Sequence, residues 1–248
     1  MKMKIPFWAS VFTVIGIAIL CSLGTWQIYR LQWKTEILSR VDDAFAQIHD
    51  GKVADFSIDV DMARDDFIIG GAFTGYFLHG KELLIQSRVY DGVPGYHLIT
   101  PFVVTGQERP AVVLVNRGWI PLEAERSDDF TILRPEGGLT ISGMLIAPPD
   151  AKYQPENEPD RNMWYRVDLK QLQDYMKIDN LEPKMLYVGG GDNNADSGAY
   201  PVSVMSKLRS NIKNNHAQYA IFWFVMAVAM SAVYLVRFIL PQIKQSEE

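Results

Sequence analysis

The sequence lacks cysteine pairs and clustered positive charge, and each absence excludes a class of function. Its 248 residues contain one cysteine, Cys21, so no internal disulfide bond can form and no CxxC motif is available for thiol exchange or zinc binding. The net charge is −5, and the Lys and Arg residues are scattered along the chain. Because nucleic-acid binding requires a clustered basic face, we exclude nucleic acid as a partner.

Motifs for common enzyme reactions are absent as well. The sequence has no nucleophile elbow, phosphate-binding loop, zinc signature or glycine-rich dinucleotide turn. The glycine run 189–191 follows a predicted strand but lacks the GxGxxG spacing, which favours a flexible turn. Acidic pairs such as Asp65-Asp66 are interpreted as solvated surface. We therefore predict that the protein is not an enzyme, and any metal chemistry must use His, Met, carboxylates or a prosthetic group.

Charge is also missing from two long runs near the ends of the chain. Residues 5–29 and residues 214–236 contain no Asp, Glu, Lys or Arg. About 20 apolar residues cross a hydrocarbon layer of ~30 Å, so both runs predict transmembrane helices. A cleaved signal peptide is the alternative for the first run. However, its apolar core exceeds the usual ~7–15 residues, and the sequence after it is a poor cleavage site.

The predicted organisation has four parts. Residues 5–29 form one transmembrane helix, 30–213 a domain outside the membrane, 214–240 a second transmembrane helix and 241–248 a short tail. Two spans place both termini on the same side of the membrane. The distribution of Lys and Arg does not decide which side, because the positive-inside rule loses force for loops beyond ~60 residues.

The middle domain has the pattern of a β-rich fold. Residues 30 to about 46 continue the first span as a helix, and short segments rich in β-branched and aromatic residues follow. These predicted strands are Phe67–Phe77, Lys81–Val89, Tyr96–Val104, Ala111–Trp119, Leu139–Ile146 and Lys184–Val188. A helix is predicted at Asp168–Met176, and a long exposed loop at Asp150–Arg161. Short gaps favour antiparallel neighbours, so we predict an antiparallel β-rich (α+β) domain, a small barrel or sandwich, between two transmembrane helices.

A first cluster of polar and aromatic residues ends the first apolar run. It comprises Gly24, Trp26, Gln27, Arg30, Trp33 and Lys34. Trp26, Arg30 and Trp33 share one helical face. One interpretation is an interfacial belt, because such residues are common where a span leaves the bilayer. The other is a site for an amphiphile, in which Trp stacks on an aromatic body while Arg and Lys pair with anionic arms.

A second cluster begins the second apolar run. His216, Tyr219 and Trp223 share one helical face, and Asn214 or Asn215 is a plausible N-cap. A titratable residue at a membrane span suggests function, and neutral imidazole is a common axial ligand of haem iron. A histidine at the interface can equally hydrogen-bond a lipid headgroup.

A third cluster, Asn116-Arg117-Gly118-Trp119, closes a predicted strand. Gly118 permits a tight bend. Arg117 is either a surface charge or a clamp for an anion, and a turn at the strand end is sufficient to explain the glycine.

Four motifs in this order resemble the SURF1 family of cytochrome c oxidase assembly factors. The motifs are GTWQIYRLQWK at 24–34, GYHLITPF at 95–102, VLVNRGWIP at 113–121 and NNHAQYAIFWF at 214–224. The resemblance covers the whole chain. It implies an inner-membrane protein with two spans and a domain in the periplasm of bacteria or the intermembrane space of mitochondria. Such a protein helps to install haem a in subunit I of the oxidase.

The resemblance also implies roles for individual residues. A His and a Trp implicated in haem a binding correspond to His216 and Trp223, and a sensitive Gly corresponds to Gly24. We expect His216 to be the axial ligand of the haem iron. The side chains expected around the haem are Trp223, Tyr219 and Trp26 beside the macrocycle and Arg30, Lys34 or Arg117 at the propionates. The other motif positions are Gln27, Trp33, Asn116, Gly118, Trp119 and Asn215.

The expected partners are oxidase subunit I, the haem a synthase and the lipid bilayer. The absence of an evident mitochondrial presequence favours a bacterial inner membrane, with both termini cytoplasmic and the domain periplasmic; the mitochondrial inner membrane is the alternative. The main alternative function is a scaffold that stabilises nascent subunit I or the synthase without binding haem. A haem-modifying oxidoreductase and an unrelated membrane-anchored sensor rank below it. His49, His79 and His97 remain possible second ligands, although we interpret His97 as part of a strand.

Overall fold

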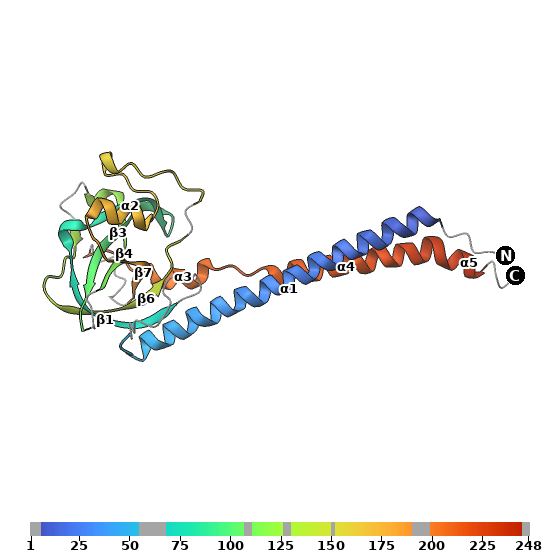
Figure 1. Ribbon diagram of the computed structural model, residues 1–248, viewed down its shortest axis with the longest axis horizontal. Coiled ribbons are helices and arrows are strands. Elements are labelled where there is room, and N and C mark those ends of the chain that lie inside the picture. The colour runs from blue at the N-terminus through green and yellow to red at the C-terminus, as the bar shows by residue number, and fades with distance from the viewer. Residues whose placement is uncertain are drawn as a thin grey trace. The chain divides into compact units, whose positions relative to one another are not determined.

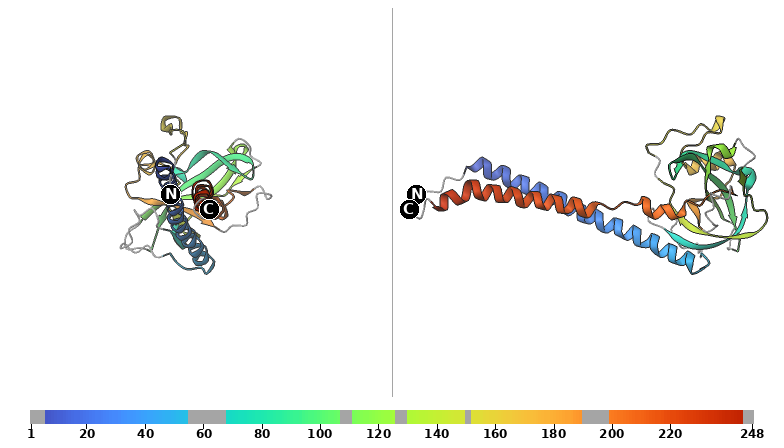
Figure 2. Two further views of the ribbon diagram at one scale, coloured as in Figure 1. Left: turned by 90° about the vertical axis from the view of Figure 1, so that its right-hand side faces the viewer. Right: turned by 180° about the vertical axis from the view of Figure 1, so that it is seen from behind.

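The computed structural model describes residues 6–54, 68–106, 111–125, 130–149, 152–189 and 199–244. The chain divides into two compact units. One, the helical unit, combines Met1–Leu38 with Ile212–Glu248, and the other, the domain, is Ser39–Asn211. Figures 1 and 2 show long helices in the helical unit and a curled sheet in the domain.

The helical unit contains the two predicted spans. Helix α1 (Phe7–His49) has 43 residues, or about 65 Å at ~1.5 Å per residue, which is twice the thickness of a hydrocarbon layer. Helix α4 (His216–Tyr234) continues through a π-helical segment, η5 (Leu235–Ile239), into α5 (Leu240–Lys244). By length and composition, α1 and the helix from His216 to Ile243 are both sufficient to cross a membrane. The predicted continuation of the first helix beyond Arg30 is confirmed.

Helices α1 and α4 pack side by side and antiparallel. From one end of the pair to the other, the facing pairs are Thr35 with Asn214, Gln27 with His216, Gly24 with Phe224, Gly16 with Met230 and Ser10 with Tyr234. Among the buried and half-buried residues of α1, eight recur at alternating steps of three and four. They are Ser10, Thr13, Ile17, Leu20, Gly24, Gln27, Leu31 and Lys34. This is the heptad spacing of a helical pair with one continuous seam.

The described residues of the domain form eight strands with short helices between them. The strands are β1 (Ile69–Phe77), β2 (Leu83–Tyr90), β3 (Val93–Val104), β4 (Ala111–Pro121), β5 (Thr131–Ile132), β6 (Leu139–Ile146), β7 (Leu181–Gly189) and β8 (Ala199–Tyr200). The helices are α2 (Leu169–Met176), α3 (Met205–Asn211) and the 3₁₀ turns η1 (His79–Lys81), η2 (Leu122–Glu125) and η3 (Pro159–Arg161). All six predicted strands are present, although Phe67 lies outside the described residues.

Five of these strands close into a barrel. The sheet order is β1-β6-β7-β4-β3-β2, and β1 also pairs with β3, which completes the ring. Strand β3 is long enough to pair with β2 over Val93–Ile99 and with β1 at Phe102–Val104. Of the two predicted alternatives, a small barrel or a sandwich, the structure shows the barrel. Within the barrel the pairing is antiparallel except between β4 and β7, because the connection from β6 through α2 brings β7 in between β6 and β4. A second, small sheet pairs β5 with β8 in parallel.

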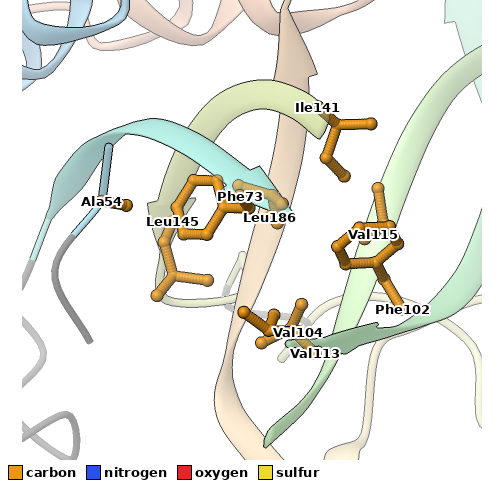
Figure 3. Packing of buried hydrophobic residues seen from close by; sticks show 9 residues of the cluster. All are labelled: Ala54, Phe73, Phe102, Val104, Val113, Val115, Ile141, Leu145 and Leu186. Carbon is orange, nitrogen blue, oxygen red and sulfur yellow. The ribbon is translucent and has the colours of Figure 1, made fainter. Parts of the chain in front are cut away.

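The barrel interior is a continuous apolar core. Phe73, Phe102 and Val115 are among the side chains that meet there, each at most 1% exposed, and Figure 3 shows them converging from different strands. The alternation of inward and outward side chains along each strand produces this core.

Two local features differ from the predictions. Strand β4 does not end at Trp119 but runs to Pro121, and Gly118 lies within it at φ 134°, where a register shift against β3 leaves Arg117 as an extra residue. This is a β-bulge, not a turn at a strand end. In addition, the predicted exposed loop contains a buried Asn157, whose side chain makes four hydrogen bonds with the segment that precedes α2 and with α2 itself.

Candidate functional site

One hydrogen bond joins the two helices of the helical unit at the start of α4. The Nδ1 atom of His216 lies 2.7 Å from Oε1 of Gln27. A carbonyl oxygen only accepts, so Nδ1 carries the ring proton and donates it. The second ring nitrogen of the neutral imidazole, Nε2, therefore keeps its lone pair. His216 is half-buried, whereas Gln27 is 9% exposed and lies within the seam.

The predicted site residues on both helices follow the same spacing. On α4 the positions are His216, Tyr219 and Trp223, and on α1 they are Gln27, Arg30 and Lys34, which is i, i+3 and i+7 in each case. At ~100° per residue, each set covers about 60° of its helix. Because the helices are antiparallel and His216 faces Gln27, the two arcs turn toward the same edge of the seam. We call these six residues the His216 edge.

The side chains of the His216 edge combine aromatic rings with positive charge. Tyr219 is 54% exposed, Trp223 is half-buried, and the ring of Phe222 lies edge-on to Trp223 at 5.2 Å between centroids. The guanidinium of Arg30 stacks over Trp33 at 3.9 Å from the ring centre. Arg30 and Lys34 follow Gln27 by about one and two helical turns, beyond the apolar run.

The opposite edge of the seam is closed by tight packing. Gly24 is buried, and a Cβ atom placed on it would lie 2.7 Å from the ring of Phe224. Glycine at this position allows the two helix backbones to approach closely. Asn215 occupies the N-cap position of α4, as predicted, but its side chain makes no capping hydrogen bond.

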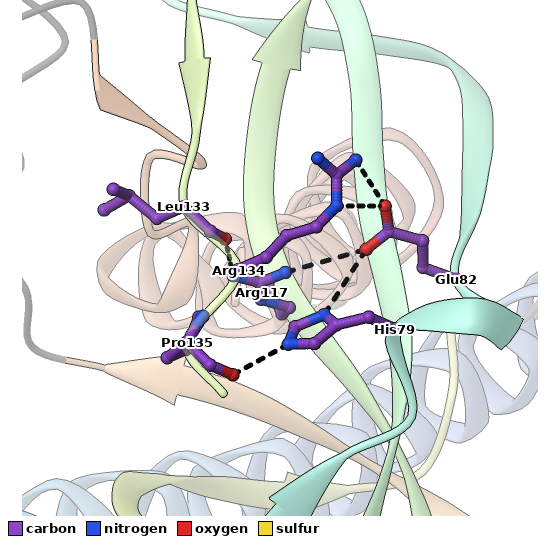
Figure 4. A network of polar contacts seen from close by, with 6 residues as sticks. All are labelled: His79, Glu82, Arg117, Leu133, Arg134 and Pro135. Atoms are coloured by element: carbon purple, nitrogen blue, oxygen red, sulfur yellow. Dashed lines mark hydrogen bonds and ion pairs between the residues drawn. The ribbon is translucent and has the colours of Figure 1, made fainter. Parts of the chain in front are cut away.

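Arg117 lies in the domain, and its charge already has partners there. Its side chain donates to the carbonyl oxygen of Leu133 and lies 3.8 Å from the carboxylate of Glu82. Glu82 also binds Arg134 at 2.7 Å and lies 3.7 Å from Nδ1 of His79, as Figure 4 shows. Burial lowers the pKa of the Arg117 guanidinium, while Glu82 opposes this shift. This network could not be predicted from the sequence, since its members are distant in the chain.

Asn116 and His97 form a second polar pair in the domain. The Asn116 oxygen accepts from the backbone N–H of Gly118 at 3.0 Å, so its NH₂ group faces Nδ1 of His97 at 3.1 Å and donates to it. Burial lowers the pKa of His97 to about 4, and the positive charge of Arg88 adds to the shift. The neutral ring thus accepts at Nδ1 and carries its proton on Nε2. His97 lies in β3, as predicted.

The remaining histidines differ from His216 as well. His79 donates from Nε2 to the carbonyl oxygen of Pro135 at 2.8 Å, and its Nδ1 is buried beside Glu82. His49 is the exposed last residue of α1. Trp119, the last member of the third cluster, stacks on Tyr90 at 5.5 Å in the domain. Among the residues that the structure describes, no group of three or more His, Cys, Asp or Glu side chains is placed to hold a metal ion.

The chemistry of the His216 edge fits the haem a implied by the sequence motifs. A haem needs one imidazole nitrogen with a free lone pair, aromatic or apolar surface for its macrocycle and positive charge for its propionates. The edge offers Nε2 of His216, the rings of Tyr219 and Trp223, and the charges of Arg30 and Lys34. Several of the facing residues in this seam were missed from sequence, among them Thr35, Phe224 and Met230.

Comparison with known proteins gives a consistent result over most of the chain. The model of the SURF1 family matches residues 14–228. A SURF1-like protein of Rickettsia prowazekii is 28% identical over 225 residues, covering 88% of this chain and 84% of that protein. Surfeit locus protein 1 of Takifugu rubripes is 26% identical and that of Homo sapiens 25%, each over 233 residues. These two alignments cover 88% of this chain, with 91% of the fish protein and 73% of the human protein.

Proposed function

The chain belongs to the SURF1 family, and on that premise we propose that it is an assembly factor for an aa₃-type cytochrome c oxidase that carries haem a to subunit I. The observation that supports this function most directly is the hydrogen bond between His216 and Gln27. It leaves Nε2 of His216 with a free lone pair, which is the form of histidine that ligates iron.

Haem a is the cargo in this proposal, and the residues of the His216 edge bind and orient it. Nε2 of His216 ligates the iron. Tyr219 and Trp223 contact the macrocycle, with Trp26 at its border, and the positive charges of Arg30 and Lys34 face the propionates. A single histidine ligand leaves the other side of the iron for the receiving protein, which favours release of the cargo. Arg117 is not needed, because its charge is paired within the domain.

The proposed location follows from the apolar helices and the family. Both long helices cross a bacterial inner membrane, both termini lie in the cytoplasm and the domain lies in the periplasm. The His216 edge then lies where the spans reach the outer boundary of the bilayer, a suitable depth for an amphiphile with an apolar tail and two carboxylates. The proposed partners are subunit I and the haem a synthase.

Substitution of His216 tests the ligand assignment. We expect His216→Ala, purified after coexpression with a haem a synthesis pathway, to lose most of its haem and to show a shifted Soret band. His49→Ala is the matched control, because His49 is an exposed histidine outside the helical unit, and it is expected to load like the wild type. Equal haem content in His216→Ala and wild type would show that His216 is not the ligand.

A further inference from the structure

The amide of Gln27 is buried between the two helices, where it contacts His216. Gln27 lies within the run of 25 uncharged residues at 5–29 and is 9% exposed. A buried polar side chain in a membrane span is costly unless it is hydrogen-bonded. Its oxygen meets Nδ1 of His216 at 2.7 Å, a bond between residues 189 positions apart in the chain.

We infer that Gln27 is the positioning residue that makes His216 a metal ligand. This inference rests on the proposed function and adds a residue to it. By accepting the Nδ1 proton, the Gln27 oxygen selects the tautomer in which Nε2 is unprotonated. It also fixes the orientation of the ring and strengthens Nε2 as an electron donor. Partners of this kind commonly orient and tune histidine ligands of metals.

The other histidines show why such a partner is needed. The Nδ1 atom of His97 faces a donor, the NH₂ group of Asn116, and its ring therefore carries the proton on Nε2. A donor in place of the Gln27 oxygen would impose this same tautomer on His216, with the proton on Nε2, and so remove the lone pair that binds iron. The identity of one atom opposite Nδ1 thus decides whether the histidine is able to bind iron.

Three substitutions separate the positioning role from a role in packing. Gln27→Leu keeps the approximate volume but removes the acceptor, and Gln27→Glu keeps an oxygen at the same reach. Gln32→Leu is the matched control, because Gln32 is exposed on the same helix. Nitrogen-15 NMR of histidine-labelled apoprotein in nanodiscs reports which ring nitrogen is protonated, with no haem present.

We expect Nε2 of His216 to be unprotonated in the wild type, in Gln27→Glu and in Gln32→Leu, and to become largely protonated in Gln27→Leu. Titration with haem a is expected to give about 10- to 100-fold weaker binding in Gln27→Leu alone. An unchanged tautomer in Gln27→Leu, or an altered tautomer with unchanged affinity, would overturn the inference while leaving haem binding intact. A wild-type protein that takes up no haem overturns the proposed function itself, and the positioning role falls with it.

Discussion

At the scale of single residues, His97 and His216 each use Nδ1 for one hydrogen bond to a side-chain amide, but the two bonds run in opposite directions. His216 donates to an oxygen, and His97 accepts from an NH₂ group. The first ring therefore exposes a lone pair at Nε2, and the second carries a proton there. The two histidines lie in matched motifs of the same chain and still have different chemistry, because their partners differ.

The lowered pKa of His97 predicts a specific dependence of stability on pH. The folded protein has a pKa of about 4 at His97, against 6.5 for an ordinary histidine. Between these values the unfolded chain takes up a proton that the folded chain does not. Stability is therefore complete above pH 6.5 and falls as the pH is lowered toward 4. From pH 7 to pH 5 the loss is about 2 kcal/mol.

Replacement of His97 by glutamine tests this prediction. Glutamine keeps an oxygen that is able to accept from Asn116, but it does not titrate. We expect thermal unfolding of the full chain in detergent to show a smaller loss of stability between pH 7 and pH 5 in His97→Gln than in the wild type. Parallel pH profiles for the two proteins would show that His97 is not the group responsible.

Sequence identified some of these residues but not their connections. His216 and Trp223 followed from a motif, and Gln27 lay in another motif without an assigned role. The spacing of residues within one helix cannot reveal which residue of another helix, almost 190 positions later in the chain, lies opposite a given side chain. For Arg117 the sequence left a surface charge and an anion clamp as alternatives. The bulge and the distant Glu82 that position its side chain depend on strand register, which the sequence pattern does not fix.

At the scale of helices and strands, Gly24 determines how closely α1 and α4 approach. Gly24 lies three residues before Gln27 on α1. Because it has no side chain, it leaves space for the ring of Phe224. Any side chain here must displace an aromatic ring within the seam. The same close approach is required for the 2.7 Å bond between Gln27 and His216.

We predict that Gly24→Leu destabilises the helical unit by about 1–3 kcal/mol through overpacking, and that Gly24→Ala has a smaller effect, because only the far end of the Phe224 ring must move. Gly24→Leu is also expected to lower haem content by separating Gln27 from His216. Thermal unfolding in nanodiscs and haem content measure the two effects. Ala18→Leu is the control, because Ala18 is exposed on the same helix; wild-type behaviour of Gly24→Leu would contradict the prediction.

Helices and strands were predicted well where the sequence pattern that indicates them lies within the element itself. The two apolar helices, the six strands and α2 followed from composition and periodicity. Three features depended on contacts distant in sequence and were not predicted: the closure of the barrel between β1 and β3, the parallel pairing of β4 with β7, and the ordered loop around Asn157. A polar segment predicts exposure, yet Asn157 is buried because its side chain is hydrogen-bonded to the backbone of Tyr165 and Arg166 and to the side chain of Gln171.

At the scale of the whole molecule, the chain consists of a helical unit with the His216 edge and a separate barrel domain. The residues that are proposed to hold haem a belong to the helical unit. The charged network around Glu82 and the pair formed by His97 and Asn116 belong to the domain, where their hydrogen bonds and ion pairs are internal. This division predicts that substitutions in the domain network change stability, whereas substitutions at the His216 edge change cargo binding.

The most direct test of the central claim is the haem content of the wild-type protein, purified after coexpression with a haem a synthesis pathway and analysed by absorbance and haem extraction. We predict about one haem a per chain, retained through purification and lost in His216→Ala. Haem-free protein that still copurifies with oxidase subunit I would contradict the account, and would identify the protein as a scaffold for assembly instead of a carrier of haem.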